Sequence, residues 1–249
     1  MAAARTPHIS QAADARRAKR PGARGGCPPL RILYQDQWLI AVDKPAGIIV
    51  HADGTGAPTL TDAVRAHLLA SGEADAAQAL QALQRLDRDT TGIVLFSLDK
   101  QVQPAFDRLI AERAIRKRYL AIVDGRFPGT KTMRQPLGRD RHDSRRMRVS
   151  RTGKPAHTEA TRLACTASSA GGRARSLVAV DLHTGRKHQI RVHLSHAGFP
   201  IAGDTLYGGA PCPGGLMLHA SELSFAHPVS GQDVLIKAPY PQRFRRLIS

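Results

Sequence analysis

A carboxylate between two arginines, followed by hydroxyl residues and a glycine, is the stretch of this sequence best suited to chemistry. Asp87 lies between Arg85 and Arg88, and Thr90 follows shortly before a glycine turn. The apolar run at 93–96 that comes next is short, rich in β-branched residues and bounded by that turn, so it predicts a buried strand. Asp87 is therefore expected in a loop that a core strand holds rigidly, where functional side chains are often placed.

The same stretch has two competing interpretations. Asp and Thr before a glycine are ordinary turn residues, because their side chains bond the local backbone and glycine accepts unusual φ values. The order Asp-x-Asp-x-Thr at 87–91 also matches the nucleophile loop of haloacid-dehalogenase-type phosphatases. That chemistry needs an apolar strand directly before the first Asp and a later acidic pair for magnesium. Here the lead-in at 81–86 is mixed, and Asp204 has Gly208 where a second acid would be needed, so the phosphatase stays the competing hypothesis.

The charge of the chain indicates a polyanionic partner. Of its 249 residues, 37 are Lys or Arg against 20 Asp or Glu, which gives a formal net charge of +17. Nucleic acid is the first candidate partner and an anionic membrane the second, but no basic amphipathic helix with a bulky apolar face stands out. Arginine supplies most of the charge, and its fork suits phosphates and base stacking.

Cysteine usage and hydropathy bear on the compartment. Cys27, Cys165 and Cys212 are odd in number and widely spaced, which argues against a disulfide framework or a cysteine-type zinc site. No apolar run approaches the length of a membrane span, and the N-terminus has no signal-peptide core. A cytoplasmic location is the expectation, with no membrane contact.

The N-terminal residues 1–29 are predicted to form a disordered basic tail, because they are rich in Ala, Arg, Gly and Pro. A solvated tail, an arm along RNA phosphates and an organellar presequence are the three interpretations. Residues 30–249 show no internal linker or repeat and are expected to form one domain. No interface pattern is evident, so a monomer is expected.

Hydrophobic periodicity predicts an alternation of strands and helices within that domain. Strands are expected at 31–34, 38–42, 93–96, 115–125, 156–165, 175–183, 216–225 and 234–237. Thr59 with Asp62 predicts a capped helix, which Gly72 ends. Asp99 is expected to cap a helix that reaches about Ala114. A helix with Ile190, His193, Leu194 and Ala197 on one face, and a short basic helix at 241–247, complete the pattern.

Two further features could bind ligands. Residues 131–154 are unusually basic and contain too little apolar matter for a core element, so a surface loop or hairpin that meets phosphate is predicted. His188, His193 and His196 could suggest a metal, but no carboxylate lies at a partnering spacing and the zinc-protease pattern is absent. No metal is predicted, and hydrogen-bonded or RNA-facing histidines are favoured.

The order of several motifs resembles the RluA-type pseudouridine synthase family. Arg85-Leu86-Asp87-Arg88-Asp89-Thr90-Thr91-Gly92 is similar to that family's His-Arg-Leu-Asp-x-x-Thr-Ser-Gly signature, with Gln84 in place of His and Thr91 in place of Ser. The other matching segments follow in the family's order: Ile32–Asp36, Asp43–Gly47, Lys117–Ala121, Thr184–His193, Gly203–Gly208, Leu218–Ala220 and His227-Pro228. The resemblance covers essentially residues 31–249. It implies that residues 30–249 are a catalytic domain, without the separate N-terminal RNA-binding domain that many members of the family carry.

The resemblance implies an α+β fold, with a mixed and mainly antiparallel sheet, flanking helices and a central catalytic cleft. It also implies isomerisation of a uridine in ribosomal or transfer RNA, with base flipping and no cofactor. Asp87 would be the nucleophile or electrostatic partner at the sugar, Arg191 its ion-pair partner, and Tyr119 the stacking residue and possible base. The substrate-binding residues would be Arg85, Arg88, Thr90, Arg186, His188 and Leu218. A non-catalytic RNA-binding protein remains the other alternative.

Overall fold

The computed structural model describes residues 30–166 and 174–248. At its centre is a ten-stranded sheet in the order β1-β2-β4-β11-β5-β10-β9-β6, with β12 paired to β11 and β3 paired to β4. Among the described strands of this sheet, β4 and β11 form the one parallel pair, and the others pair antiparallel. The predicted mixed, mainly antiparallel sheet is confirmed. The predicted basic tail at 1–29 lies outside the described residues.

The element boundaries follow the predicted pattern closely. The strands are β1 (Ile32–Gln35), β2 (Leu39–Lys44), β3 (Gln81–Ala82), β4 (Thr91–Ser97), β5 (Arg116–Asp124), β6 (Thr130–Met133), β7 (Leu137–Arg139), β8 (Met147–Val149), β9 (Thr158–Cys165), β10 (Arg175–Leu182), β11 (Leu218–Ala226) and β12 (Asp233–Lys237). The helices are α1 (Leu60–Ala70), α2 (Ala74–Ala79), α3 (Gln103–Ala111), α4 (Gln189–His196), the 3-10 turn η1 (Thr205–Tyr207) and α5 (Gln242–Ile248).

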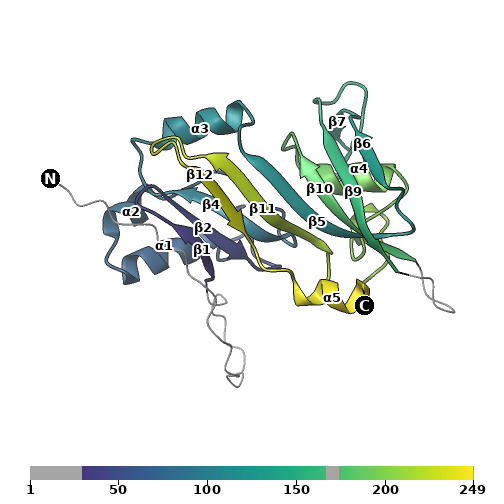
Figure 1. The fold of residues 1–249 in the computed structure, drawn as a ribbon, viewed down its shortest axis with the longest axis horizontal. Helices are drawn as coiled ribbons and strands as arrows, with labels where there is room; N and C mark the ends of the chain where they lie inside the picture. Colours follow the sequence, from purple (N-terminus) through teal and green to yellow (C-terminus); the bar gives the residue numbers. More distant parts are fainter. Residues whose placement is uncertain (1–29, 167–173, 249) are drawn as a thin grey trace, which may run out of the picture.

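The sheet can be described as two halves that meet where β11 pairs with β5: β1, β2, β4 and β11 on one side, and β5, β10, β9 and β6 on the other. Figure 1 shows α1 and α2 beside the β1–β2 end of the sheet, and α4 beside β9 and β10 at the other end. Helix α5 lies below the centre in this view, and α3 lies above it. Segments far apart in the sequence therefore meet along the middle strands, where loops from both halves can converge.

Strand β4 is buried on both faces, which explains its continuous apolar pattern. Val94 and Phe96 pack with α1 and α2, whereas Ile93 and Leu95 pack with α3 and β12 on the opposite face. A strand covered on both sides loses the alternation of polar and apolar residues that a half-exposed strand shows. The loop that precedes β4, which carries Asp87, is thus anchored to the best-buried strand of this half.

A capping box begins α1, as the sequence predicted. The Thr59 hydroxyl accepts the Asp62 N–H, and the Asp62 carboxylate accepts the Thr59 N–H at 3.0 Å. These two bonds satisfy backbone N–H groups that no backbone carbonyl of the helix can reach. The apolar stripe Leu60, Val64 and Leu68 is then directed onto the sheet, where all three side chains are buried.

Two sequence-based expectations need correction. Asp99 does not cap α3: its carboxylate accepts the Gln101 N–H, and the helix begins only at Gln103, with Pro104 in its first turn. Backbone N–H groups in the first turn of a helix have no partner within the helix, so a proline there loses no hydrogen bond. The position of Pro104 therefore places the helix start after the Asp99 turn. The helix also ends at Ala111, before Ala114.

The basic segment 131–154 forms the predicted hairpin only in part. Strands β7 and β8 pair as a separate two-stranded sheet, in agreement with the hairpin prediction. Residues 130–133 instead form β6 on the edge of the main sheet, where Met133 is buried. The backbone pairing with β9 compensates for the low apolar content that argued against a core element here.

Gly92 is required where β4 pairs with β11, and its replacement by alanine is expected to destabilise the protein. Its φ is +106°, and a Cβ there would overlap the carbonyl of Ala220. Strain and overpacking together should lower the free energy of unfolding by about 2–5 kcal/mol in Gly92→Ala, measured by urea denaturation. Gly72→Ala is the matched control, because Gly72 has φ +78° and open space around it. Equal losses in the two variants would contradict the backbone-contact argument.

Candidate active site

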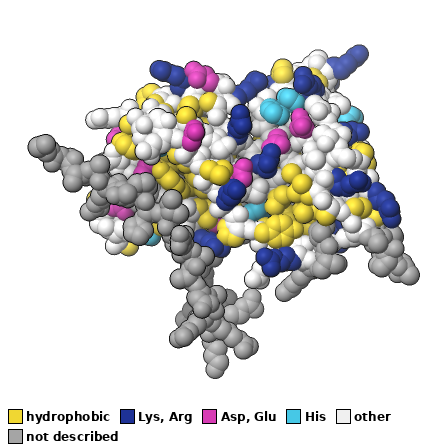
Figure 2. All heavy atoms as spheres, viewed as in Figure 1, with side chains coloured by type: hydrophobic (Ala, Val, Ile, Leu, Met, Phe, Trp, Pro, Cys, Tyr) yellow, Lys and Arg dark blue, Asp and Glu magenta, His cyan; other side chains and the backbone are white. Residues whose placement is uncertain are grey.

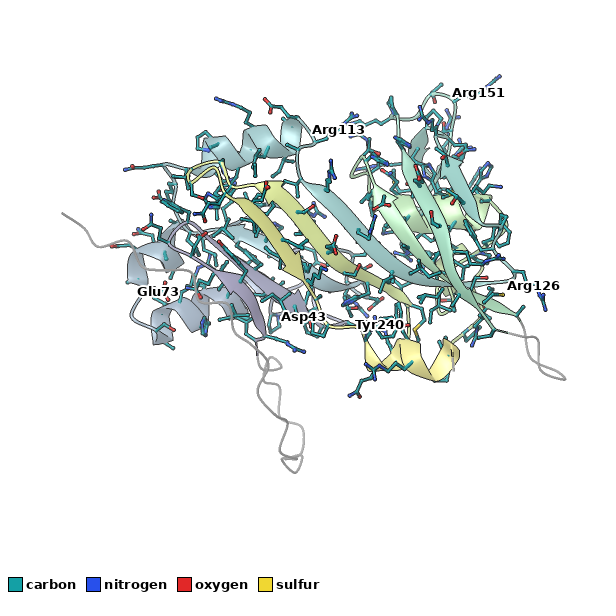
Figure 3. All side chains as sticks on the ribbon, in the orientation of Figure 1. Asp43, Glu73, Arg113, Arg126, Arg151 and Tyr240 are labelled. Atoms are coloured by element: carbon teal, nitrogen blue, oxygen red, sulfur yellow. The ribbon has the colours of Figure 1, made fainter. Side chains whose placement is uncertain are left out.

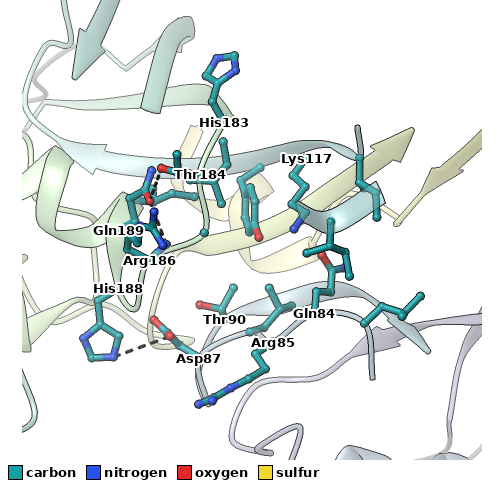
Figure 4. A pocket seen from close by; sticks show the side chains of 18 of the residues that line it. Gln84, Arg85, Asp87, Thr90, Lys117, His183, Thr184, Arg186, His188 and Gln189 are labelled. Atoms are coloured by element: carbon teal, nitrogen blue, oxygen red, sulfur yellow. Dashed lines mark hydrogen bonds and ion pairs between the residues drawn. The ribbon is translucent and has the colours of Figure 1, made fainter. Parts of the chain in front are cut away.

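A cleft of about 590 Å³ crosses the middle of the molecule. Its walls come from the loop before β4, the end of α3, the first half of β5, the segment between β10 and α4, and the start of β11. Figure 4 shows side chains from these elements pointing into one pocket. The volume falls within the usual range for small-molecule sites. Both halves of the sheet thus contribute to one concave site.

The structure brings eight of the nine predicted site residues into this cleft. Asp87, Tyr119 and Arg191 line it, as do the following predicted binding residues: Arg85, Thr90, Arg186, His188 and Leu218. Arg88 does not line it. The Arg88 side chain is 69% exposed and lies 3.6 Å from Asp89, whereas its backbone carbonyl faces inward.

A buried lysine holds the Asp87 loop in place. Lys44, at the end of β2, is fully buried, and its ammonium donates to the carbonyls of Pro45, Ile48 and Arg88 at 2.7–2.9 Å. Burial lowers the pKa of Lys44 to about 8, and the carboxylates of Asp89 and Asp87 oppose that shift. The group is therefore still charged at pH 7, with all three N–H bonds used. It ties the loop after β2 to the loop that carries Asp87.

Asp87 is paired with an arginine that a second carboxylate positions. Arg191, in the first turns of α4, donates from Nη1 to Asp87 at 3.0 Å. Its Nε and Nη2 donate to the two oxygens of Asp204 at 2.7 and 2.8 Å. Burial opposes the charge of Arg191, but the contacts with Asp204 and then Asp87 raise its pKa. A two-point bond to Asp204, whose side chain is 1% exposed, fixes the plane of the guanidinium.

A hydrogen-bonded histidine and tyrosine complete the wall beside Asp87. His188 has a left-handed φ of +55°, and its Nε2 lies 3.8 Å from Asp87. Its Nδ1 shares a 2.7 Å hydrogen bond with the Tyr207 hydroxyl, which also accepts the Met147 N–H. The ring of Tyr207 lies under the Arg191 guanidinium, 4.9 Å away. Burial lowers the pKa of His188, so a neutral imidazole is favoured. The β7–β8 hairpin is thereby joined to the side chains around Asp87.

Tyr119 lies on β5 with its ring at the cleft. The side chain is buried, and it belongs to the apolar cluster formed by β5, β10 and β11. Burial, with a smaller contribution from the Asp87 charge, raises the pKa of its hydroxyl. The phenol is therefore protonated at neutral pH. It is suited to stacking and hydrogen-bond donation, and poorly suited to removing protons.

Histidine chemistry does not indicate a bound metal in this arrangement. Both ring nitrogens of His193 are hydrogen-bonded, to Thr158 and to the carbonyl of Gln135. In the described part of the chain, one group has potential ligand atoms within 4.8 Å of one another: His157, Glu159 and His183. The two imidazoles stack with centroids 4.1 Å apart and planes at 16°. A metal lies in the plane of each imidazole that binds it, and two nearly parallel stacked rings cannot share one ion.

Three supporting residues were not assigned roles from the sequence. Asp204 was noted only as a possible magnesium ligand, and its pairing with Arg191 was missed. Lys44 was noted only as part of a motif, because a lysine is normally exposed. Tyr207 gave no separate signal. The motifs Asp43–Gly47 and Gly203–Gly208 did contain these residues, so the order of the motifs was the available indication.

Comparison with solved structures identifies the class of fold. The chain aligns with human RNA pseudouridylate synthase domain-containing protein 1 at a TM-score of 0.72 and 26% identity, over 88% of this chain and 86% of that one. Human RNA pseudouridylate synthase domain-containing protein 4 aligns at 0.69 and 25%, over 86% and 90%. The α+β fold is thus the pseudouridine synthase fold, as the resemblance implied.

Sequence comparison then identifies the family. Residues 38–196 match the family model described as RNA pseudouridylate synthase. An uncharacterised RNA pseudouridine synthase of Bacillus subtilis, YhcT, is 35% identical over 88% of this chain and 71% of its own length. The ribosomal large subunit pseudouridine synthase D of Xanthomonas campestris is 36% identical over 89% and 69%. The chain belongs to the RNA pseudouridylate synthase family, and it is accordingly an isomerase that acts on uridine in RNA.

Replacing Lys44 should destabilise the loop that carries Asp87. Lys44→Met keeps much of the side-chain volume but leaves three inward-facing carbonyls without their donor. Removing the donor of buried acceptors should lower the free energy of unfolding by about 2–4 kcal/mol, measured by urea denaturation. The exposed Lys100→Met is the control and should change stability by less than about 0.5 kcal/mol. Similar stability in both variants would show that the Lys44 contacts are unimportant.

Proposed function

We propose that Asp87 is the nucleophile or electrostatic partner at the glycosidic carbon of the target uridine. The observation that carries this proposal is the Asp87–Arg191 contact of 3.0 Å inside an open cleft. Asp87 keeps 26% of its side-chain surface exposed, so a sugar can approach it. A carboxylate suits a reaction that develops positive charge at the sugar carbon. Arg191 keeps that carboxylate in one orientation, because Asp204 fixes the guanidinium from the other side.

The remaining cleft residues support the binding of an extruded uridine. Tyr119 is proposed to stack on the uracil, and Leu218 offers an apolar contact on the neighbouring strand β11. The Thr90 hydroxyl is buried and has no hydrogen-bond partner among residues 30–166 and 174–248, which suits a donor reserved for substrate. Arg85 would fill the gap that the flipped nucleotide leaves in the RNA stack. His188 and Arg186 would contact the nucleotide backbone from the segment before α4.

The surface around the cleft supports RNA as the partner. Figure 2 shows Lys and Arg side chains over both halves of the molecule on one face. Arg113, which lines the cleft at the end of α3, and Arg151, beyond β8, lie toward the same side in Figure 3. Arg88 is proposed to contact RNA phosphates together with these arginines, because its side chain lies outside the cleft. Guanidinium groups at the rim would hold phosphates of the strand that surrounds the flipped base.

The substrate is proposed to be RNA of the large ribosomal subunit. Similar proteins from Xanthomonas campestris and Nitrosomonas europaea carry the name ribosomal large subunit pseudouridine synthase D, and the latter is 36% identical over 88% of this chain. A monomeric protein that works in the cytoplasm, with residues 30–249 as one catalytic domain, is consistent with this role. None of the helices in the described part of the chain has the length and apolar character needed to cross a bilayer.

The phosphatase hypothesis has no support in the site. It needs a second carboxylate free to bind magnesium beside Asp87. Asp204 is the later acid that the sequence offered, and both of its oxygens are bonded to Arg191. A guanidinium between the two carboxylates occupies the position that a divalent cation would need. The loop order Asp-x-Asp-x-Thr is therefore interpreted as a coincidence of turn residues.

Asp87→Asn should abolish pseudouridine formation while preserving the fold. The amide has nearly the same shape but cannot act as a nucleophile or stabilise a cationic sugar, so single-turnover rates should fall by about 10⁴-fold or more. Pseudouridine is measured in transcribed ribosomal RNA by chemical labelling and primer extension. Asp89→Asn is the matched control, because Asp89 is exposed, lies outside the cleft lining and forms an ion pair with the exposed Arg88. Turnover near the wild-type rate in Asp87→Asn would refute the assignment.

Mapping pseudouridines in cells with and without the protein tests the proposed substrate. Loss of the protein should remove pseudouridine at one or a few positions of large-subunit ribosomal RNA and leave transfer RNA unchanged. Adding back the wild-type gene should restore those positions, whereas the Asp87→Asn gene should not. Loss confined to transfer RNA would contradict the ribosomal proposal without affecting the assignment of Asp87.

A further inference from the structure

Lys117 extends into the same cleft, and the described part of the chain offers its ammonium no hydrogen-bond or ion-pair partner. It lies on β5, two residues before Tyr119, so both side chains are on the same face of the strand. Both residues line the cleft, and Figure 4 shows Lys117 and Asp87 extending into it from different elements. Across residues 30–166 and 174–248, no hydrogen bond or ion pair involves the Lys117 ammonium. A free amine thus faces the space where the uracil is proposed to stack.

The surroundings of Lys117 disfavour the charged form of its amine. Apolar side chains of Leu109, Ile110 and Ile115 line the cleft with it. Burial lowers the pKa of Lys117, and no carboxylate compensates for that burial. Lys44 differs in this respect, because three carbonyls occupy its protons and hold it as a structural cation. A partly desolvated lysine with no ion partner releases its proton more readily than an exposed lysine, and a general base needs that property.

The reaction requires a proton acceptor, and the other polar side chains around Asp87 are poorly suited to that role. Once C5 of uracil has bonded to the sugar carbon, C5 still carries its hydrogen, and that proton must leave. Asp87 is occupied at the sugar and bonded to Arg191. The raised pKa of Tyr119 makes its hydroxyl a weak acceptor of protons. His188 has Nδ1 bonded to Tyr207 and Nε2 directed at Asp87.

We propose that Lys117 is a further catalytic residue, whose amine removes the C5 proton of the rearranged uracil. This rests on the proposed placement of the uridine beside Asp87. The neutral amine takes the proton from C5, and the electron pair of the C5–H bond restores the C5–C6 double bond. The electrons of the N1–C6 double bond, which arose when C5 bonded to the sugar carbon, return to N1, and the Lys117 ammonium gives that nitrogen a proton. Protons and electrons balance, and the amine is regenerated.

The first test compares substrates that carry hydrogen or deuterium at C5. In single-turnover reactions, Lys117→Met should slow pseudouridine formation by about 10²- to 10⁴-fold, the usual contribution of a general base. Removal of the C5 proton should become rate-limiting, so the deuterium isotope effect should exceed that of the wild type. Lys117→Arg should behave like Lys117→Met, because a guanidinium cannot accept a proton. The exposed Lys100→Met is the control and should match the wild type in both rate and isotope effect.

A second substrate separates proton removal from binding. RNA with 5-fluorouridine at the target has no proton to remove at C5, so its rearrangement proceeds only as far as the new carbon–carbon bond. Lys117→Met should form that fluorinated product at the wild-type rate. Equal slowing on uridine and 5-fluorouridine, or recovery of activity in Lys117→Arg, would overturn the proposal and leave a binding role. Failure of the wild type on both substrates would instead overturn the proposed function itself.

Discussion

The shared guanidinium of Arg191 is the interaction on which the site depends. It joins two carboxylates that come from opposite parts of the chain, Asp87 before β4 and Asp204 before η1. An isolated pair of buried opposite charges is often no better than apolar packing, because desolvation opposes the attraction. Here the more buried carboxylate, Asp204, satisfies two of the guanidinium donors, and the more exposed Asp87 takes one. The Asp87 carboxylate, which faces the cleft, is therefore held in one orientation and is still accessible to a substrate.

The sheet explains why such an arrangement can be rigid. Asp87 precedes β4, Arg191 lies in the first turn of α4, Tyr119 lies in the first half of β5 and Leu218 begins β11. Each of these side chains is thus carried by a packed element or by the loop next to one. The parallel contact of β4 with β11 joins β4 to the centre of the sheet, and Gly92 permits that close approach. Lys44 then fixes the loop through three carbonyls. A small displacement of any one support would move the carboxylate relative to the sugar.

Local patterns in the sequence predicted local structure well, and contacts between distant residues poorly. The Thr59–Asp62 box and the apolar run of β4 depend on neighbours within a few residues, so their sequences contain the whole signal. Asp99 was misplaced because an Asp before an apolar segment can either cap a helix or form a turn, and only the position of Pro104 distinguishes the helix start from the turn. The family resemblance provided the Asp87–Arg191 pairing, which spacing alone could not have given across 104 residues.

The burial of individual side chains could not be predicted from the sequence, and it determines what each charged group in the cleft can do. Lys44 and Lys117 are the same residue type, and each lies within a strand, Lys44 at the end of β2 and Lys117 near the start of β5. One faces three carbonyls and remains a structural cation, whereas the other faces an apolar wall and open space. In the same way, burial keeps the phenol of Tyr119 protonated while the accessible Asp87 remains bonded to a cation. A strongly basic protein can therefore bind a polyanion with its exposed arginines and still keep, in one cleft, a carboxylate, a neutral phenol and an unpaired amine.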